Sequence, residues 1–142
     1  MRINFGVTLC CLVLCSCKTY YITTESLKKQ FASIDSAKLK SVTVRGPIGE
    51  KYNYLANGIP LIYCTDKSGN TVAFSNSPSI EVRVTELNGK KTIFYFDRLF
   101  ISDSTLYGVR SRFISAIRKE IKLADIKKIE VQDGGKNFSY VN

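Results

Sequence analysis

Hydrophobic residues recur at helical spacing in the first part of the chain. Leu27, Phe31 and Ile34 are separated by four and then three positions, so they share one face of a helix. Thr23 or Thr24 can cap the first turn, because a threonine hydroxyl accepts a hydrogen bond from an exposed backbone N–H group. The pattern therefore predicts an amphipathic helix that ends near residue 35.

The hydrophobic period changes to two after residue 39, and the clearest strand is Ser79–Leu87. Asn88–Gly89 follows it and fits a two-residue type I′ turn, which requires positive φ at both positions. Lys91–Phe96 is then the antiparallel partner. In this register Val84 faces Ile93, and Val82 faces Tyr95.

Several other segments have the same strand pattern and are separated by turns rich in Gly, Asn and Asp. A second hairpin is expected across Asp103–Ser104, a helical turn is possible at Leu123–Asp125, and Tyr52–Gly58 is expected to be an irregular loop. The remaining expected strands are 39–45, 59–65, 71–74, 99–102, 105–110, 117–123, 126–132 and 137–141.

Many short strands joined by tight turns predict a mainly β fold, either a small antiparallel barrel or a sandwich, with one N-terminal amphipathic helix. An α+β arrangement is the alternative. The length of 142 residues and the 44% hydrophobic content fit a single globular domain.

The composition limits the chemistry that the chain can perform. It contains no histidine, which removes the commonest acid–base group and a common metal ligand. We therefore expect no metal or other cofactor, and we favour a non-catalytic role over an enzyme. Lysine and arginine number 21 against 12 acidic residues, a net charge of +9 that favours anionic partners.

The N-terminus combines a positive start with a short apolar run. Arg2 supplies the charge, and Phe5–Leu14 is about ten residues long. A bilayer-spanning helix needs roughly 20 apolar residues, so this run fits the centre of a secretory signal peptide instead. It leads directly into Leu14-Cys15-Ser16-Cys17.

The Leu14–Cys17 sequence resembles the lipobox of bacterial lipoproteins. The resemblance implies that residues 1–16 are a signal peptide, that Cys17 becomes the acylated first residue, and that acyl chains attach the protein to a membrane. Residues 17–23 would be a lipidated tether and residues 24–142 a single globular β-rich domain. Lys18 in place of aspartate, without a following acidic run, implies the outer membrane of the cell envelope, facing the periplasm.

The body of the chain resembles the small lipoproteins common in Bacteroidota. The resemblance is carried by Phe94–Asp97, Asp103–Gly108 and Ile129–Gly134, and it implies neither an activity nor functional residues. In that lineage Asp-Ser signals direct periplasmic O-glycosylation. Ser36 and Ser104 are therefore possible modification sites, although both Asp-Ser pairs also suit turns.

Four basic residues near the C-terminus are the candidate binding residues. Arg110 and Arg112 have strand spacing and should project to one side, and Arg118 and Lys122 follow on the next strand. Such a face fits an envelope protein or an acidic glycan, whereas a solvated surface is the simpler interpretation. The envelope compartment argues against nucleic acid. The alternative function is a carrier that holds a lipid or small hydrophobic ligand inside a barrel cavity.

The lipobox generates a direct test at Cys17. The wild type should incorporate a clickable fatty-acid analogue during growth, because its thiol is the acylation site, and Cys17→Ala should lose the label. Cys15→Ala should keep it. Labelling of the Cys17→Ala protein at the wild-type level would contradict the assignment.

Overall fold

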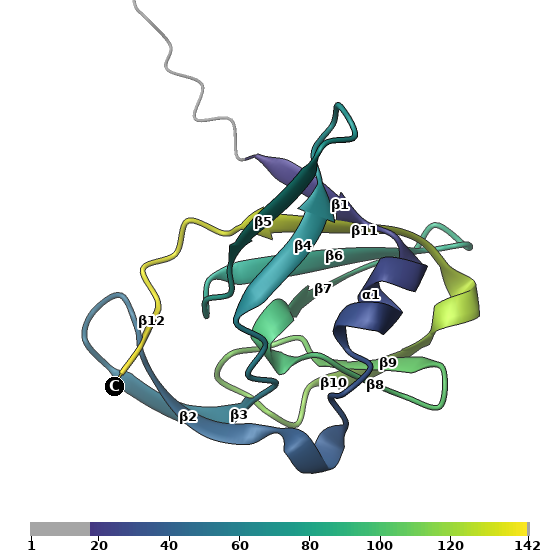
Figure 1. The fold of residues 1–142 in the computed structure, drawn as a ribbon. Helices are drawn as coiled ribbons and strands as arrows, with labels where there is room; N and C mark the ends of the chain where they lie inside the picture. Colours follow the sequence, from purple (N-terminus) through teal and green to yellow (C-terminus); the bar gives the residue numbers. More distant parts are fainter. Residues whose placement is uncertain (1–17, 142) are drawn as a thin grey trace, which may run out of the picture.

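The computed structural model describes residues 18–141, so the expected signal peptide and Cys17 lie outside the described residues. Figure 1 shows the arrangement of the elements. The helical elements are α1 (Thr24–Gln30), η1 (Ser36–Lys38), η2 (Phe96–Arg98) and η3 (Leu123–Asp125). The strands are β1 (Thr19–Ile22), β2 (Lys40–Arg45), β3 (Lys51–Ala56), β4 (Leu61–Thr65), β5 (Thr71–Ser75), β6 (Ile80–Glu86), β7 (Lys91–Tyr95), β8 (Phe100–Ser102), β9 (Thr105–Val109), β10 (Arg118–Lys122), β11 (Ile126–Asp133) and β12 (Ser139–Tyr140).

The strands form one large and two small antiparallel sheets. The large sheet has the order β5-β4-β1-β11-β6-β7, and the small sheets have the orders β10-β9-β8 and β12-β2-β3. The predicted mainly β sandwich is confirmed, whereas the barrel option is wrong because the strands of residues 18–141 do not close on themselves. None of the helices in this part of the chain is long and apolar enough to cross a bilayer.

Helix α1 forms where its hydrophobic spacing predicts it. The Thr23 hydroxyl accepts a hydrogen bond from the Ser26 N–H group, and Leu27 and Phe31 are buried. The helix ends at Gln30, earlier than expected. The Gln30 amide donates to the carbonyl of Tyr63 and accepts from its N–H group, so this side chain pairs with β4 like a short piece of strand.

The segment expected to be a tether at residues 17–23 is partly a strand. Thr19–Ile22 form β1, which lies between β4 and β11 inside the large sheet. Ile22 is buried in the core. A segment of four residues is too short for its sequence pattern to reveal that both of its edges are paired. The folded domain therefore begins at β1 rather than at residue 24.

The β6–β7 hairpin is confirmed, but its predicted register is wrong by one residue. Val84 pairs with Thr92, and Arg83 pairs with Ile93. Gly89 alone in this turn has a positive φ, and the Glu86 N–H group bonds to the Lys90 carbonyl. The connection is therefore a three-residue loop with glycine in the left-handed position, and the extra residue shifts the pairing.

Residues 51–56 form β3, so the prediction of an irregular loop at Tyr52–Gly58 is wrong over that stretch. The second hairpin is confirmed: Ser102 pairs with Thr105 across a turn in which Asp103 and Ser104 both have positive φ.

Close approach of the β10-β9-β8 sheet to the core depends on Gly108. A Cβ atom built on Gly108 would lie 2.4 Å from Cδ1 of Phe94 and 2.7 Å from Cδ2 of Leu99. Both of these side chains are completely buried. Glycine therefore lets β9 pack directly on Phe94 and Leu99, and it keeps the β10-β9-β8 sheet close to the core.

Gly108→Ala should lower the free energy of unfolding by about 1–3 kcal/mol, because the added methyl group overpacks a core that has no room for it. Urea denaturation measures the change. Lys122→Ala, at an exposed position on neighbouring β10, should stay within about 0.5 kcal/mol of the wild type. Equal stability of Gly108→Ala and wild type would show that β9 does not pack as described.

Candidate functional site

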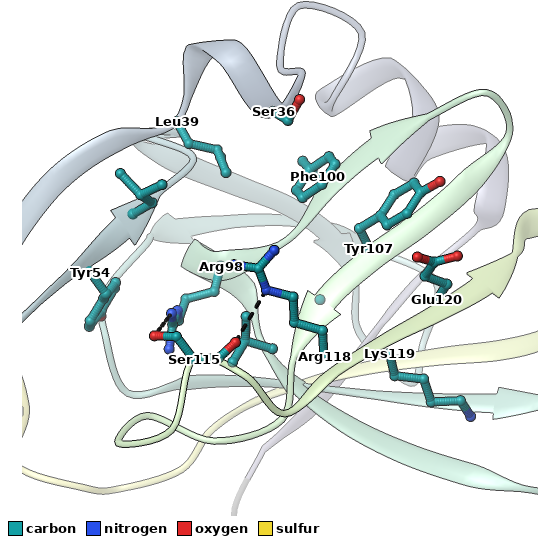
Figure 2. Close-up of a pocket in the computed structure, with 13 residues that line it drawn as sticks. Ser36, Leu39, Tyr54, Arg98, Phe100, Tyr107, Ser115, Arg118, Lys119 and Glu120 are labelled. Atoms are coloured by element: carbon teal, nitrogen blue, oxygen red, sulfur yellow. Dashed lines mark hydrogen bonds between the residues drawn. The ribbon is translucent and has the colours of Figure 1, made fainter.

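A cleft of about 540 Å³ opens between the β10-β9-β8 sheet on one side and η1 and β3 on the other (Figure 2). This volume lies in the range of roughly 300–1,000 Å³ typical of small-molecule sites. Its lining is mainly apolar, and the polar groups come from a few side chains. The lining residues are Ser36, Leu39, Tyr54, Leu55, Arg98, Phe100, Tyr107, Gly108, Val109, Ser115, Arg118, Lys119 and Glu120.

Strand pairing places the aromatic wall of the cleft. Phe100 on β8 is the register partner of Tyr107 on β9, and their rings stack with centroids 4.8 Å apart and planes 4° from parallel. Glu120 on β10 is the partner of Tyr107 on its other side. Leu39 and Leu55 approach the cleft from the opposite side.

Arg98 in η2 brings a buried positive charge to the cleft. Its side chain is 6% exposed, and its two terminal nitrogens donate to the Ser111 carbonyl and the Ser115 hydroxyl, both at 3.0 Å. Its Nε has no hydrogen-bond partner within residues 18–141. Burial lowers the pKa of Arg98, and the positive charges of Arg112 and Arg118 lower it further against the opposing effects of Tyr54 and Asp97.

Arg118 supplies a second guanidinium to the same part of the cleft. Its Nε donates to the Ser115 carbonyl at 3.2 Å, while the Ser115 hydroxyl accepts from Arg98. Figure 2 shows Ser115 between the two arginines, with Arg118 extending into the cleft and Glu120 on the side of Tyr107. No carboxylate of residues 18–141 forms an ion pair with either arginine.

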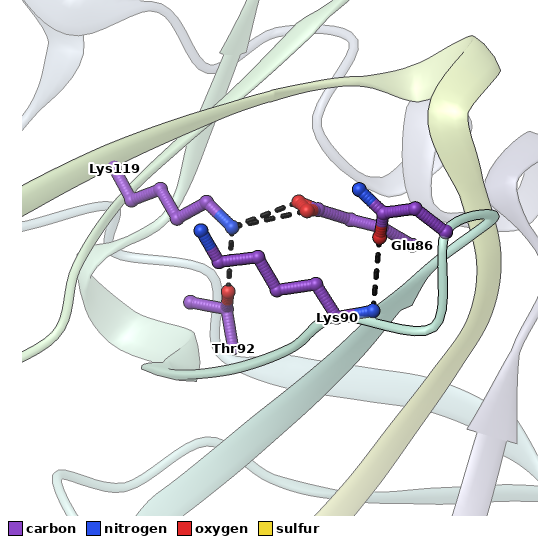
Figure 3. A network of polar contacts seen from close by, with 5 residues as sticks. Glu86, Lys90, Thr92 and Lys119 are labelled. Atoms are coloured by element: carbon purple, nitrogen blue, oxygen red, sulfur yellow. Dashed lines mark hydrogen bonds and ion pairs between the residues drawn. The ribbon is translucent and has the colours of Figure 1, made fainter.

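Lys119 also lines the cleft, but its charge is neutralised elsewhere. Its ammonium group lies 2.8 and 3.1 Å from the two carboxylate oxygens of Glu86 and donates to the Thr92 hydroxyl at 2.8 Å (Figure 3). This largely buried ion pair, with the bond to Thr92, joins β10 to β6 and β7. Arg98 and Arg118 are consequently the cations whose charge faces the cleft.

The wall formed by β3 is held by a buried carboxylate. Asp97 is fully buried, and its Oδ2 accepts hydrogen bonds from the hydroxyls of Tyr54 at 2.5 Å and Tyr140 at 3.0 Å. The Asn57 side chain donates to the carbonyls of Phe96 and Leu99. These bonds attach β3 and β12 to η2, so the same turn positions the wall and Arg98.

The basic face expected from the sequence is only partly formed. Arg118 and Lys122 are exposed and lie on the same side of β10, with Glu120 between them. Arg110 is exposed in the loop after β9. The prediction for Arg112 is wrong: it is 5% exposed, because its guanidinium packs 3.8 Å from the Tyr95 ring centroid.

Arg98, which lines the candidate site, and its neighbour Asp97 are not among the residues predicted from the sequence. The signal was the Asp-Arg pair inside the apolar run Phe94–Phe100. Two charges in such a run are expensive to bury without partners, which marks them as residues with a specific structural or binding role.

The possible glycosylation sites Ser36 and Ser104 are both exposed. Ser36 begins η1, which Asp35 caps, and it lies at the cleft. Ser104 occupies the β8–β9 turn. Their modification stays a prediction.

Comparison with known proteins gave no relative from which a role could be transferred: no family model, curated protein or solved structure matches the chain. The geometry of the cleft is therefore the basis for assigning a function.

The buried carboxylate generates a pH prediction. Burial raises the pKa of Asp97, although the hydrogen bonds from Tyr54 and Tyr140 and the nearby arginines oppose this. An unfolded aspartate titrates near pKa ~3.9, so the stabilisation linked to the bound proton is complete below about pH 4. It is lost as the pH rises through the higher pKa of the folded state.

The wild type should therefore lose stability relative to Asp97→Asn as the pH rises above about 4, because the variant cannot ionise. Urea unfolding of both proteins at several pH values measures this difference. Asp103→Asn, at an exposed turn with positive φ, is the matched control and should follow the wild type. If the difference in the free energy of unfolding between wild type and Asp97→Asn does not change with pH, the raised pKa of Asp97 is contradicted.

Proposed function

We propose that this chain is a lipid-anchored, non-catalytic binding module of the bacterial cell envelope, and that it binds a small molecule with an apolar body in the cleft. The observation that carries the proposal is the cleft itself: about 540 Å³, lined by Leu39, Leu55, Phe100 and Val109 together with the Tyr107 ring. Pockets that combine an apolar lining with a few convergent polar groups are the usual sites for small ligands.

The distribution of charge supports a small ligand over a large anionic partner. An extended basic face for a protein or acidic glycan would need Arg112 at the surface, and that side chain is buried. The exposed Arg118 and Lys122 are separated along the strand by Glu120. The carrier function predicted from the sequence is therefore retained with a different binding place. The ligand occupies the open cleft and not the interior of a barrel.

Two observations support a binding role over catalysis. The sequence has no histidine. Among the residues that line the cleft, Glu120 is the single carboxylate, whereas glycoside hydrolysis, for example, uses a pair of carboxylates.

The proposed anchor restricts how the cleft meets the membrane. Only Lys18 separates Cys17 from Thr19, the first residue of β1. Two extended residues reach about 7 Å, so a lipidated Cys17 would hold this end of the large sheet close to the bilayer. The cleft is lined by β3, β8, β9 and β10, and these strands lie at the opposite end of the molecule from β1 (Figure 1). In the proposed outer-membrane location it opens toward the periplasm and takes its ligand from there.

A neutral fluorescent hydrophobe, N-phenyl-1-naphthylamine, tests for binding in the cleft. The purified protein should enhance its fluorescence saturably with one site, and Leu55→Asp should weaken the affinity about tenfold, because a carboxylate in an apolar cleft must be desolvated. Leu55 is 51% exposed, so the substitution should not prevent folding.

Leu61→Asp is the matched control for this measurement. Leu61 is 41% exposed on β4 and is not among the residues that line the cleft, so its substitution should leave the affinity unchanged. Absence of saturable binding, or equal loss in both variants, would show that the cleft is not a hydrophobic ligand site.

A further inference from the structure

Arg98 and Arg118 leave an excess of positive charge in an otherwise apolar cleft. Both guanidiniums bind the same residue, Ser115, and neither forms an ion pair within residues 18–141. The nearest acidic residue in sequence, Asp97, is already bound by two tyrosine hydroxyls. Arg98 is buried and Arg118 is exposed, so it is the charge of Arg98 that is costly without a counterion, and an anion beside the two guanidiniums would offset that cost.

The buried arginine also has an unused donor. The Nε of Arg98 is buried without a partner, whereas its terminal nitrogens are held by Ser111 and Ser115. The guanidinium is held rigidly by these contacts, so an incoming acceptor would not have to order it first.

Glu120 limits how much negative charge the cleft accepts. It lies on the Tyr107 side of the cleft, two residues beyond Arg118 on the same side of β10. One anionic group at the arginines is favourable, but a second group further along the ligand would meet this carboxylate. The apolar and aromatic lining between them suits an uncharged body.

We propose that the ligand is an amphipathic monocarboxylate, with its carboxylate at Arg98 and Arg118 and its apolar chain along Leu39, Leu55 and the stacked Phe100–Tyr107 pair. This inference rests on the proposed function and adds the ligand's charge and its orientation. The carboxylate is the ligand's only charge, so its apolar part fills the region beside Glu120 without repulsion.

Calorimetric titration of the purified protein tests the role of the ligand's charge. Decanoate and decan-1-ol, both used below their aggregation concentrations, have chains of the same length and differ in the charge of the head group, so a difference in affinity reports on that charge. Decanoate should bind at least tenfold more tightly than decan-1-ol, because its carboxylate accepts charge-assisted hydrogen bonds from the arginines and the hydroxyl of the alcohol carries no charge. Decylammonium, with the opposite charge, should bind more weakly than both.

Arg118→Gln should reduce the decanoate affinity about tenfold while decan-1-ol changes less than twofold. Arg118 is exposed, so this variant should fold. Lys122→Gln removes the same charge from the same side of β10 but outside the cleft, and both affinities should stay within twofold of wild type. Glu120→Gln should increase the affinity for decyl phosphate, which carries more negative charge than decanoate.

The outcomes distinguish the two proposals. Equal binding of decanoate and decan-1-ol, or equal loss of decanoate affinity in Arg118→Gln and Lys122→Gln, would overturn the carboxylate inference and leave a hydrophobic site intact. Failure of decanoate, decan-1-ol and the neutral fluorescent probe to bind would overturn both proposals.

Discussion

The buried carboxylate of Asp97 is the interaction on which the cleft depends. It accepts hydrogen bonds from Tyr54 on β3 and Tyr140 on β12, so one group attaches two strands of the β12-β2-β3 sheet to η2. The next residue, Arg98, extends to the loop before β10 and binds it through Ser111 and Ser115. A single turn thus sets the separation of the two small sheets, and with it the width of the cleft.

Elements with strong local signals could be predicted from the sequence. The spacing of Leu27 and Phe31 gave α1, and alternation gave the hairpin strands. The errors came from long-range or turn-level effects. β1 is stabilised by pairing on both edges, which four residues cannot signal. The predicted β6–β7 register assumed positive φ at both Asn88 and Gly89, whereas only Gly89 has it. The loop is therefore one residue longer, and this shifts the pairing of every residue in the hairpin by one position.

The candidate site was much harder to predict than the fold. Its residues come from η1, β3, η2, β8, β9 and β10, and strand pairing rather than sequence proximity brings them together. Arg118 was found from charge alone, but its partner Arg98 precedes it by twenty residues and comes from a different element. Arg112 carries the same charge and is enclosed by Tyr95 and Phe138. Charge on its own therefore does not separate an arginine that lines the cleft from one that packs in the interior.

The position of β1 also determines when the domain can be completed. Thr19 pairs with Gln132, more than a hundred residues later in the chain. β1 can therefore pair with β11 only after almost the whole domain has been made. Contacts between such distant segments form slowly, because a long loop must close before they are made. A growing polypeptide would lack the middle of its large sheet until synthesis is almost finished. A chain that ends before β11 would therefore leave one edge of β1 and one edge of β6 without a partner strand.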